Sequence, residues 1–422
     1  MRLSNNLMYQ NNINKILDNQ QGVANAQERV TTGEKYLTTS EAPAAISQAM
    51  LYSNKIQTNE QYTKNIDQLT GRLETEESVL QSINTNIQQA QELTIQAGNG
   101  VYTKDDLKTF ASELSGIQQT LANLMNTRSE DGKFIFSGYQ DSTQPYQLES
   151  GEYNYKGDQG QHQITIAEGV SIKASDNGFD TFEKTDARLN VLDNKAGIPT
   201  TTPANNITKG TVYVDGQAEF DKFHQANYNA DPATPVSPTA NTFSVVTTAG
   251  ATTNDPDTYE ILQDGVSLTP PQTGEVTDDT IEFAGMKIQF EGSAPGQLDF
   301  TLEKPHKENV LNTLQSLITG LNNGALEGDD FQEVLADGLV QLQNASEQVV
   351  FTQSSLGGRM NALERVSDSN LALDIQNKSN RSNLVEVDMA EAISELTKQE
   401  TALQASQATF GRLTNLSLFD YL

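Results

Sequence analysis

"DMAEAISELTKQETALQASQATFGRLTNLSLFDYL" (residues 388–422) carries one apolar residue in every seven, which is half of what a coiled-coil seam needs. That row consists of Met389, Leu396, Leu403 and Phe410. Asp388 followed by Glu391 predicts a helix N-terminus, where carboxylates are stabilised by free amides and the helix dipole. An apolar run closes the stretch: Leu416, Leu418, Phe419, Tyr421 and Leu422. The sequence therefore predicts a helix whose apolar side chains need a cover.

A second, equally thin row runs through the first forty residues. Its members lie seven residues apart: Tyr9, Ile16, Val23, Val30 and Leu37. The positions between them that would complete a seam are mostly polar or small. Because helical stability comes mainly from packing an apolar face, each terminal helix is expected to be marginal by itself. Residues 1 to about 40 and about 385 to 422 are therefore expected to be disordered in the monomer.

Two interpretations of these rows stay open. The two terminal helices are either edge helices of one bundle within the chain, or they are completed by neighbouring subunits. The apolar run at residues 416–422 favours subunit contacts, because it suits burial between copies better than exposure. The expected contact residues are Ile16, Val23, Val30, Leu37, Met389, Leu396, Leu403, Phe410, Leu416, Leu418 and Phe419.

Proline divides the chain into helical flanks and a non-helical middle. Eleven of the twelve prolines lie between Pro145 and Pro305, and proline is excluded from helix interiors. On the flanks, apolar residues recur at steps of three and four, and Thr103 with Asp106 predicts a capping box. The upstream stripe is interrupted by one polar residue, Glu76. The stripes are Leu69–Ala90, Leu107–Leu124, Val310–Leu321 and Phe331–Leu356.

The middle of the chain alternates apolar and polar residues as strands do. Four segments carry the pattern: "QITIAEGVSIKA" (163–174), "TVYVDG" (211–216), "YEILQDGVSLT" (259–269) and "IEFAGMKIQFEG" (281–292). Asp264-Gly265 predicts a hairpin turn. The fold is therefore expected to be α+β, with a discontinuous, rod-like helical bundle from both chain ends and an inserted antiparallel β-rich domain. The expected boundaries are 1–140, 141–304 and 305–422.

Composition narrows the function classes. The chain has 422 residues, a formal charge of −29 and no cysteine. A nucleic-acid backbone would be repelled, and thiolate chemistry and disulfides are excluded. The start of the sequence has no apolar signal-peptide region, and no stretch of eighteen apolar residues predicts a membrane span. No nucleic acid and no membrane insertion are expected.

No constellation of residues predicts catalysis, a cofactor or a metal. His162, His224 and His306 are interpreted as surface or loop residues, because none has a partner at ligand spacing. "ASDNGFDTFE" (174–183) lacks the spacing of a calcium loop and predicts a turn at Asn177-Gly178. The glycines of "AGNG" (97–100) and "SSLGGR" (354–359) are interpreted as helix breaks. We expect a protein that is not an enzyme.

Two separated motifs resemble the bacterial flagellin superfamily. "SNLVEVDMAEAISELTKQETALQAS" (382–406) is similar to its C-terminal helix, and "AQERVTTGEKYLTTSEAPAAISQAM" (26–50) to its N-terminal pattern. Within the superfamily, the chain resembles the hook-associated junction branch more than the filament flagellins. Three stretches carry this resemblance: "MRLSNNLMYQNN" (1–12), "GKFIFSGYQ" (132–140) and "LSLFDYL" (416–422). One departure is Ser40-Glu41-Ala42-Pro43, where relatives more often carry two adjacent acids.

The resemblance implies a structural role at the hook-filament junction of an extracellular flagellum. Such proteins are exported unfolded through the flagellar channel without a cleaved signal peptide, and they assemble through their terminal helices. The implied partners are further copies in a ring, the hook-side junction protein FlgK, flagellin and an export chaperone like FlgN. The alternatives are a filament-forming flagellin, or an adhesin or carbohydrate-active enzyme carried by the β insert.

Overall fold

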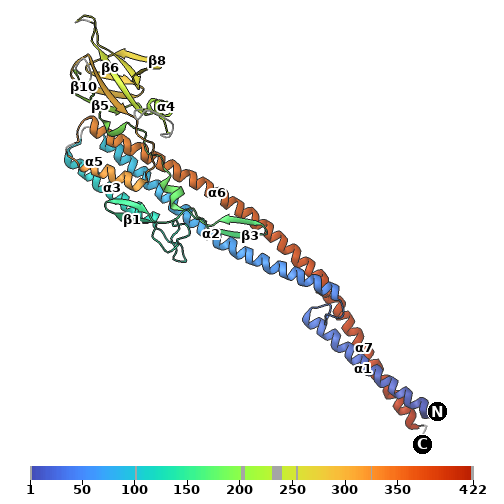
Figure 1. Cartoon of the computed structure of the whole chain (residues 1–422). Coiled ribbons are helices and arrows are strands. Elements are labelled where there is room, and N and C mark those ends of the chain that lie inside the picture. Colours follow the sequence, from blue (N-terminus) through green and yellow to red (C-terminus); the bar gives the residue numbers. More distant parts are fainter. Residues whose placement is uncertain are drawn as a thin grey trace. The chain divides into compact units, whose positions relative to one another are not determined.

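The structure is a computed structural model, and it describes residues 2–99, 102–200, 205–230, 240–252, 255–324 and 326–419, without the side chains of 2–6 and 413–419. The chain divides into two compact units (Figure 1). The first comprises Met1–Thr70, Ile164–Ile172 and Met360–Leu422, and the second Gly71–Gln163 and Lys173–Arg359. Both units are discontinuous in sequence, so each joins segments that lie far apart along the chain.

Long helices occupy both flanks, as the apolar stripes predicted. The helices are α1 (Arg2–Thr32), α2 (Pro43–Ala97), α3 (Lys104–Met125), α4 (Gln217–Asn227), α5 (Val310–Asn322), α6 (Asp329–Val385) and α7 (Met389–Phe419). A π-helical turn, η1 (Phe179–Glu183), and a 3-10 turn, η2 (Leu192–Asn194), lie between them in sequence. The capping box of Thr103 and Asp106 at α3 is confirmed.

One predicted local feature is wrong. α6 continues through Gly357 and Gly358, because a helix-interior glycine costs only about 1 kcal/mol and Leu356 and Leu363 are buried beside it. At Asn177-Gly178, where a turn was expected, the chain enters η1, with Gly178 as the residue before it. Asn177 Oδ1 accepts a hydrogen bond from the Asp180 amide at 2.7 Å.

The strands are short and all named pairs are antiparallel. They are β1 (Tyr146–Glu149), β2 (Glu152–Tyr155), β3 (Gln163–Ala167), β4 (Val170–Lys173), β5 (Lys209–Val214), β6 (Thr242–Thr248), β7 (Thr258–Gln263), β8 (Val266–Glu275), β9 (Thr280–Phe283), β10 (Met286–Glu291) and β11 (Gly296–Thr301). β1 pairs with β2 and β3 with β4, while the larger sheets have the orders β5-β10-β9 and β11-β6-β7-β8. The predicted α+β fold, with helical ends and an inserted antiparallel β domain, is confirmed.

The two larger sheets share one hydrophobic core with α4. Inward-facing residues alternate along each strand, as in β10, where Met286, Ile288 and Phe290 are buried. Phe243 of β6 lies opposite Phe300 of β11, and their rings stack with centroids 5.4 Å apart. The alternation thus fixes the register, since a shift by one residue would expose this core. Residues 231–239, within the Pro-rich stretch "NADPATPVSPTANT" (229–242), lie outside the described residues.

Two glycines in hairpin turns give a matched test of backbone crowding. Gly285 (φ +77°) and Gly265 (φ +75°) both need the left-handed region, but a Cβ on Gly285 would lie 2.2 Å from the Gly216 carbonyl oxygen, whereas Gly265 has open space. Each substitution by alanine is expected to cost about 1 kcal/mol from φ strain. Gly285→Ala should cost roughly 1–3 kcal/mol more, because the added Cβ forces the neighbouring backbone to move. Urea unfolding of both variants checks this, and equal losses would contradict it.

Within the first unit, the β3–β4 hairpin is tied to helices rather than to the β domain. Asn370 of α6 donates from Nδ2 to the Ile166 carbonyl, and Asn65 of α2 donates to the Thr165 carbonyl, each at 2.7 Å. Asn59 in turn donates to the Asn370 carbonyl at 2.5 Å. Side-chain amides thus connect α2, α6 and the hairpin where no sheet neighbour is available.

Within the second unit, a carboxylate is buried in the middle of α2. Glu76 is fully buried, and its Oε1 accepts a hydrogen bond from the Asp176 amide at 2.9 Å. Its Oε2 is buried without a partner. The Asp176 carboxylate pairs with Arg359 of α6. Burial first, and then the charge of Asp176, raise the pKa of Glu76 to about 8.

A second buried network joins the β domain to α6 in the same unit. The Arg188 side chain is 1% exposed, and its Nη1 lies 2.6 Å from Glu333 Oε1 and 2.8 Å from Asp337 Oδ1. Its Nη2 donates to the Val214 carbonyl at the end of β5 at 2.6 Å. Burial raises the pKa of both carboxyl groups, and Arg188 opposes that shift. One guanidinium therefore compensates the buried Glu333 carboxylate and the partly exposed Asp337 carboxylate.

Candidate assembly interface

The two terminal helices pack against each other within the first unit. α1 and α7 run antiparallel, as Figure 1 shows, and the Tyr9 and Phe410 rings meet edge to face with centroids 5.8 Å apart. Ala26 and Ala392 are the buried apolar residues of this pair, each 7% exposed. The buried apolar side chains described on this pair are thus small, and a search for large apolar residues does not detect them.

Polar contacts fill the seam positions that lack apolar residues. Asn19 Nδ2 donates to Ser406 Oγ at 2.6 Å and approaches the Ala402 carbonyl at 3.4 Å. Gly22 lies so close to Gln399 that an added Cβ would come 2.8 Å from its Oε1. The two half-filled rows therefore lie on helices that pair within one chain. This pairing agrees with the interpretation that the terminal helices belong to one bundle, and it leaves contacts with neighbouring subunits as a prediction.

The structure places the side chains of eight of the eleven predicted contact residues. Six are half-buried on the paired helices: Ile16, Val23, Val30, Leu396, Leu403 and Phe410. Met389 is 46% exposed at the start of α7. Leu37 lies beyond α1, because Gly33 (φ +71°) ends the helix. The side chains of Leu416, Leu418 and Phe419 lie outside the described residues. Their role in subunit contacts stays a prediction.

Other large apolar side chains on the two helices are more exposed than the predicted rows. They are Leu7, Met8, Ile13 and Leu17 on α1, and Ile393 on α7, which lies near the exposed row member Met389. Ile13 with Leu17, and Met389 with Ile393, lie four residues apart and so share a helix face. The seven-residue spacing that predicted the rows did not identify the exposed apolar residues of α1, nor Ile393 of α7. A search for apolar pairs four residues apart outside the rows could have found them.

Two short linkers meet where the four helices of this unit begin and end. Lys35 donates its amide to the Val385 carbonyl at 2.7 Å, and Val387 donates to the Gly33 carbonyl at 2.9 Å. Asp388 Oδ1 accepts from the Ala390 amide at 2.8 Å, so the predicted N-cap of α7 is confirmed. The linkers 33–42 and 386–388 are therefore held together by backbone hydrogen bonds, although neither forms a strand.

The single acid of the Ser40-Glu41-Ala42-Pro43 turn makes several contacts. Glu41 pairs with Arg29 at 3.3 Å and accepts hydrogen bonds from the Leu37 amide and the Thr38 hydroxyl, each at 3.4 Å. Ser40 adds a hydroxyl contact to Thr38 at 3.0 Å. Glu41 thus holds the turn between α1 and α2 with one carboxylate.

A groove of about 690 Å³ lies beside these linkers, and we call it the linker groove. Its apolar lining consists of Leu37, Ile46, Ala49, Met50, Val385, Val387 and Met389. Met50 is 66% exposed on the α2 side. Arg381 also lines the groove; it contacts Glu386 at 3.5 Å, while its Nε is buried without a partner. The groove therefore combines an apolar wall with one unused cationic donor.

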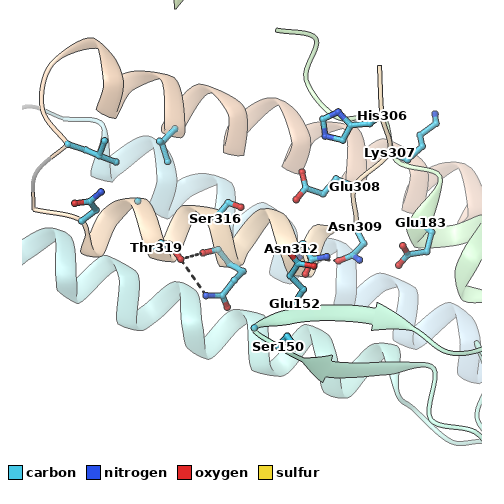
Figure 2. Close-up of a pocket in the computed structure, with 16 residues that line it drawn as sticks. Ser150, Glu152, Glu183, His306, Lys307, Glu308, Asn309, Asn312, Ser316 and Thr319 are labelled. Carbon is cyan, nitrogen blue, oxygen red and sulfur yellow. Dashed lines mark hydrogen bonds between the residues drawn. The ribbon is translucent and has the colours of Figure 1, made fainter. Parts of the chain in front are cut away.

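A larger cavity of about 780 Å³ lies in the second unit, between α5, the β1–β2 turn and residues 306–309 (Figure 2). Burial raises the pKa of Glu183 and Glu308, which line it. His306 also lines the cavity, and its Nδ1 lies 3.7 Å from Glu303 Oε1. The cavity offers amides, hydroxyls and carboxylates, but we assign it no reaction.

The histidines do not cluster. His162 lies in a loop with Nε2 2.9 Å from Asp141, and His306 is exposed. His224 was expected at the surface, and this is wrong. It is 1% exposed in α4, where Nε2 lies 2.8 Å from the Glu303 carbonyl and the ring stacks on Tyr228. Among the described residues, no group of three or more His, Cys, Asp or Glu side chains could hold a metal ion.

Family models match both ends of the chain. The model of the bacterial flagellin N-terminal helical region matches residues 3–141, and that of the bacterial flagellin C-terminal helical region matches residues 339–422. Together they cover more than half of the sequence, including α1 and α7. The chain belongs to the flagellin family. In the described part of this family member, none of the helices combines the length and apolar character needed to cross a bilayer.

Curated relatives include two kinds of flagellar protein. Flagellar hook-associated protein 3 of Escherichia coli is 37% identical over 153 residues, which are 36% of this chain and 48% of that protein. Its Salmonella typhimurium counterpart is 36% identical over 154 residues. Phase 1 flagellin of Salmonella naestved is 28% identical over 131 residues, 31% of this chain and 25% of that protein. The chain spans about half the length of the hook-associated relatives it matches.

Solved structures share the fold. Hook-associated protein 3 from Legionella pneumophila has a TM-score of 0.57 at 21% identity, covering 79% of this chain and 98% of that chain. FlgL from Xanthomonas campestris has a TM-score of 0.56 at 20% identity, covering 78% and 99%. The helical flanks with an inserted β domain are thus an arrangement that solved proteins also adopt.

Proposed function

We propose that the chain is a structural, non-enzymatic component of the bacterial flagellum that joins the hook to the filament. The observation that carries the proposal is the match to hook-associated protein 3 at 37% identity, against 28% for flagellin. The exposed apolar residues of α1 and α7 support an assembly role, since isolated soluble proteins rarely leave such sets uncovered.

In this proposal the chain is exported unfolded and then forms a ring of copies at the junction. Its partners are the hook-side junction protein FlgK on one side and flagellin on the other, and an export chaperone like FlgN covers the apolar C-terminal region beforehand. The absence of cysteine suits a chain that must unfold and refold outside the cell. The cavity in the second unit has no bearing on this role.

Deletion of the gene followed by electron microscopy tests the proposal. We expect hooks without filaments and flagellin released into the medium. Filaments of normal length on the deletion strain would overturn the proposal, and loss of surface binding with intact flagella would favour an adhesin. A filament-forming flagellin would instead polymerise into long filaments as purified protein.

Complementation with Leu403→Asp is expected to fail although the protein is produced and folded. Leu403 is half-buried on α7, and a carboxylate there should weaken the α1–α7 pair by about 2 kcal/mol. Filament counts per cell and circular dichroism of the purified variant check both halves of this expectation. Phe351→Asp, a matched change at a side chain 70% exposed on α6, should restore filaments. Normal filaments with Leu403→Asp would refute the role assigned to the row.

A further inference from the structure

Glu76 of α2, Asp176 and Arg359 of α6 form one cluster within the second unit, and we call these three residues the carboxyl latch. We infer that the latch holds residues 174–178 against α2 and α6 only while Glu76 carries a proton, and that these residues open locally when the proton is lost. The latch is a conformational switch inside one unit, so it does not depend on the proposed role in the flagellum.

Residues 174–178 connect β4 to η1 and belong to no strand, so no sheet neighbour holds them in place. The Asp176 amide donates to Glu76 Oε1 at 2.9 Å, and the Asp176 carboxylate pairs with Arg359. Arg359 Nη1 also lies 3.5 Å from the Lys173 carbonyl oxygen, at the end of β4. The hydrogen bonds and ion pairs described between this stretch and the two long helices therefore run through the latch.

The latch leaves Glu76 poorly compensated as an anion. Glu76 is fully buried, and its Oε2 has no hydrogen-bond partner. Arg359 is the cation of the cluster, but it is paired with Asp176, whose own charge repels that of Glu76. On α2 itself, Arg72 lies one turn before Glu76 and pairs with Asp131 at 3.8 Å. The folded state therefore favours the protonated carboxyl group, and the pKa of Glu76 is raised to about 8.

Local opening changes the proton affinity of Glu76. Once residues 174–178 move away from α2, water reaches Glu76, and its pKa returns towards the ordinary value of 4.5. Between these two pKa values the closed form binds the proton and the open form does not, so each pH unit raises the open fraction about tenfold. From pH 6 to pH 8 the open fraction should rise about fiftyfold, because the dependence becomes less steep near the pKa of the closed form.

Helix-interior glycines lie close to the latch on both helices. Gly71 precedes Glu76 by five residues on α2, and Gly357 and Gly358 directly precede Arg359 on α6. A Cβ at each of these glycines would meet open space, so side-chain packing does not require glycine there. Glycine weakens a helix interior relative to alanine. Both helices are therefore weakened beside the latch, which favours a local opening over unfolding of the whole unit.

Hydrogen exchange of the full-length chain, followed by mass spectrometry of the peptide that covers residues 174–178, tests the latch. Protection is measured at pH 6, 7 and 8 after correction for the intrinsic exchange rate, with and without a low concentration of urea. We expect the protection of this peptide to fall about fiftyfold from pH 6 to pH 8 and to be insensitive to urea, because a local opening exposes little surface. Protection that falls with urea as steeply as that of the buried strand β10 would mean that the peptide exchanges only by global unfolding, and the inference would be wrong.

Glu76→Gln separates the proton of the latch from other titrating groups. Glutamine keeps an oxygen for the Asp176 amide and has no acidic proton, so the protection of the peptide should be equal at pH 6 and pH 8. Glu77→Gln changes the exposed next residue of α2, so it is the matched control and should keep the roughly fiftyfold fall. A Glu76→Gln chain whose peptide still loses protection as pH rises would refute the latch and leave the proposed function standing.

Discussion

Replacing Glu76 with glutamine is expected to remove a loss of stability that the unmodified protein shows between pH 6 and pH 8. The folded-state pKa of Glu76 is raised to about 8, whereas the unfolded carboxyl titrates near 4.5. In this range the folded state binds the proton and the unfolded state does not, so stability falls as pH rises. The slope is about 1.4 kcal/mol per pH unit well below the pKa and half of that at the pKa, so the loss between pH 6 and pH 8 is about 2 kcal/mol.

The cause of the shift lies in the groups packed around Glu76. Burial disfavours its charge, Asp176 repels it, and Arg359 attracts it but is already paired with Asp176. Glutamine keeps the oxygen that accepts from the Asp176 amide and carries no charge at any pH. The variant should therefore equal the original protein near pH 5 and exceed it by several kcal/mol above pH 8.

Urea unfolding at pH 6 and pH 8 measures this difference. Glu77→Gln is the matched control, because Glu77 is the next residue of α2 and is exposed. It should leave the pH profile of the original protein unchanged. A Glu76→Gln variant that loses as much stability as the original protein on raising the pH would show that other groups control the profile.

Glu76 also illustrates what the sequence could and could not predict. The apolar stripe around it predicted the helix correctly, and the residue itself was interpreted only as a polar interruption. Its burial depends on Asp176, a hundred residues away, and on Arg359 of α6. Periodicity within one helix carries no information about such distant partners. The same reason explains His224, whose burial comes from the Glu303 carbonyl and the surrounding β-domain core.

The candidate interface was predictable in part. The rows at Ile16 and Leu403 located the two terminal helices, and the N-cap at Asp388 located the start of α7. The buried residues Ala26 and Ala392 of this pair are too small to form a recognisable stripe. The exposed pair of Ile13 and Leu17 lies off the seven-residue row, so the period that located the helices did not single out their exposed face.

Removal of the Arg188 side chain is expected to destabilise the second unit by about 3–5 kcal/mol at pH 7. Arg188→Met keeps most of the buried volume but leaves Glu333 and Asp337 without their counter-charge. Burial already raises the pKa of both carboxyl groups, and losing the guanidinium would raise it further. The folded variant then binds protons that the unfolded chain has released, so its stability falls as pH rises.

The sign of that dependence gives the test. The deficit of Arg188→Met should be largest at pH 7 or above and should shrink towards pH 5, as measured by urea unfolding at each pH. Adding Glu333→Gln and Asp337→Asn to Arg188→Met should restore much of the loss at pH 7, because no buried charge remains unpaired. Lys209→Met is the control, since its ion pair with Glu291 is 66% and 69% exposed and should contribute less than about 1 kcal/mol. A deficit of Arg188→Met that does not change with pH would mean that lost packing and hydrogen bonds, rather than unpaired charge, set its size.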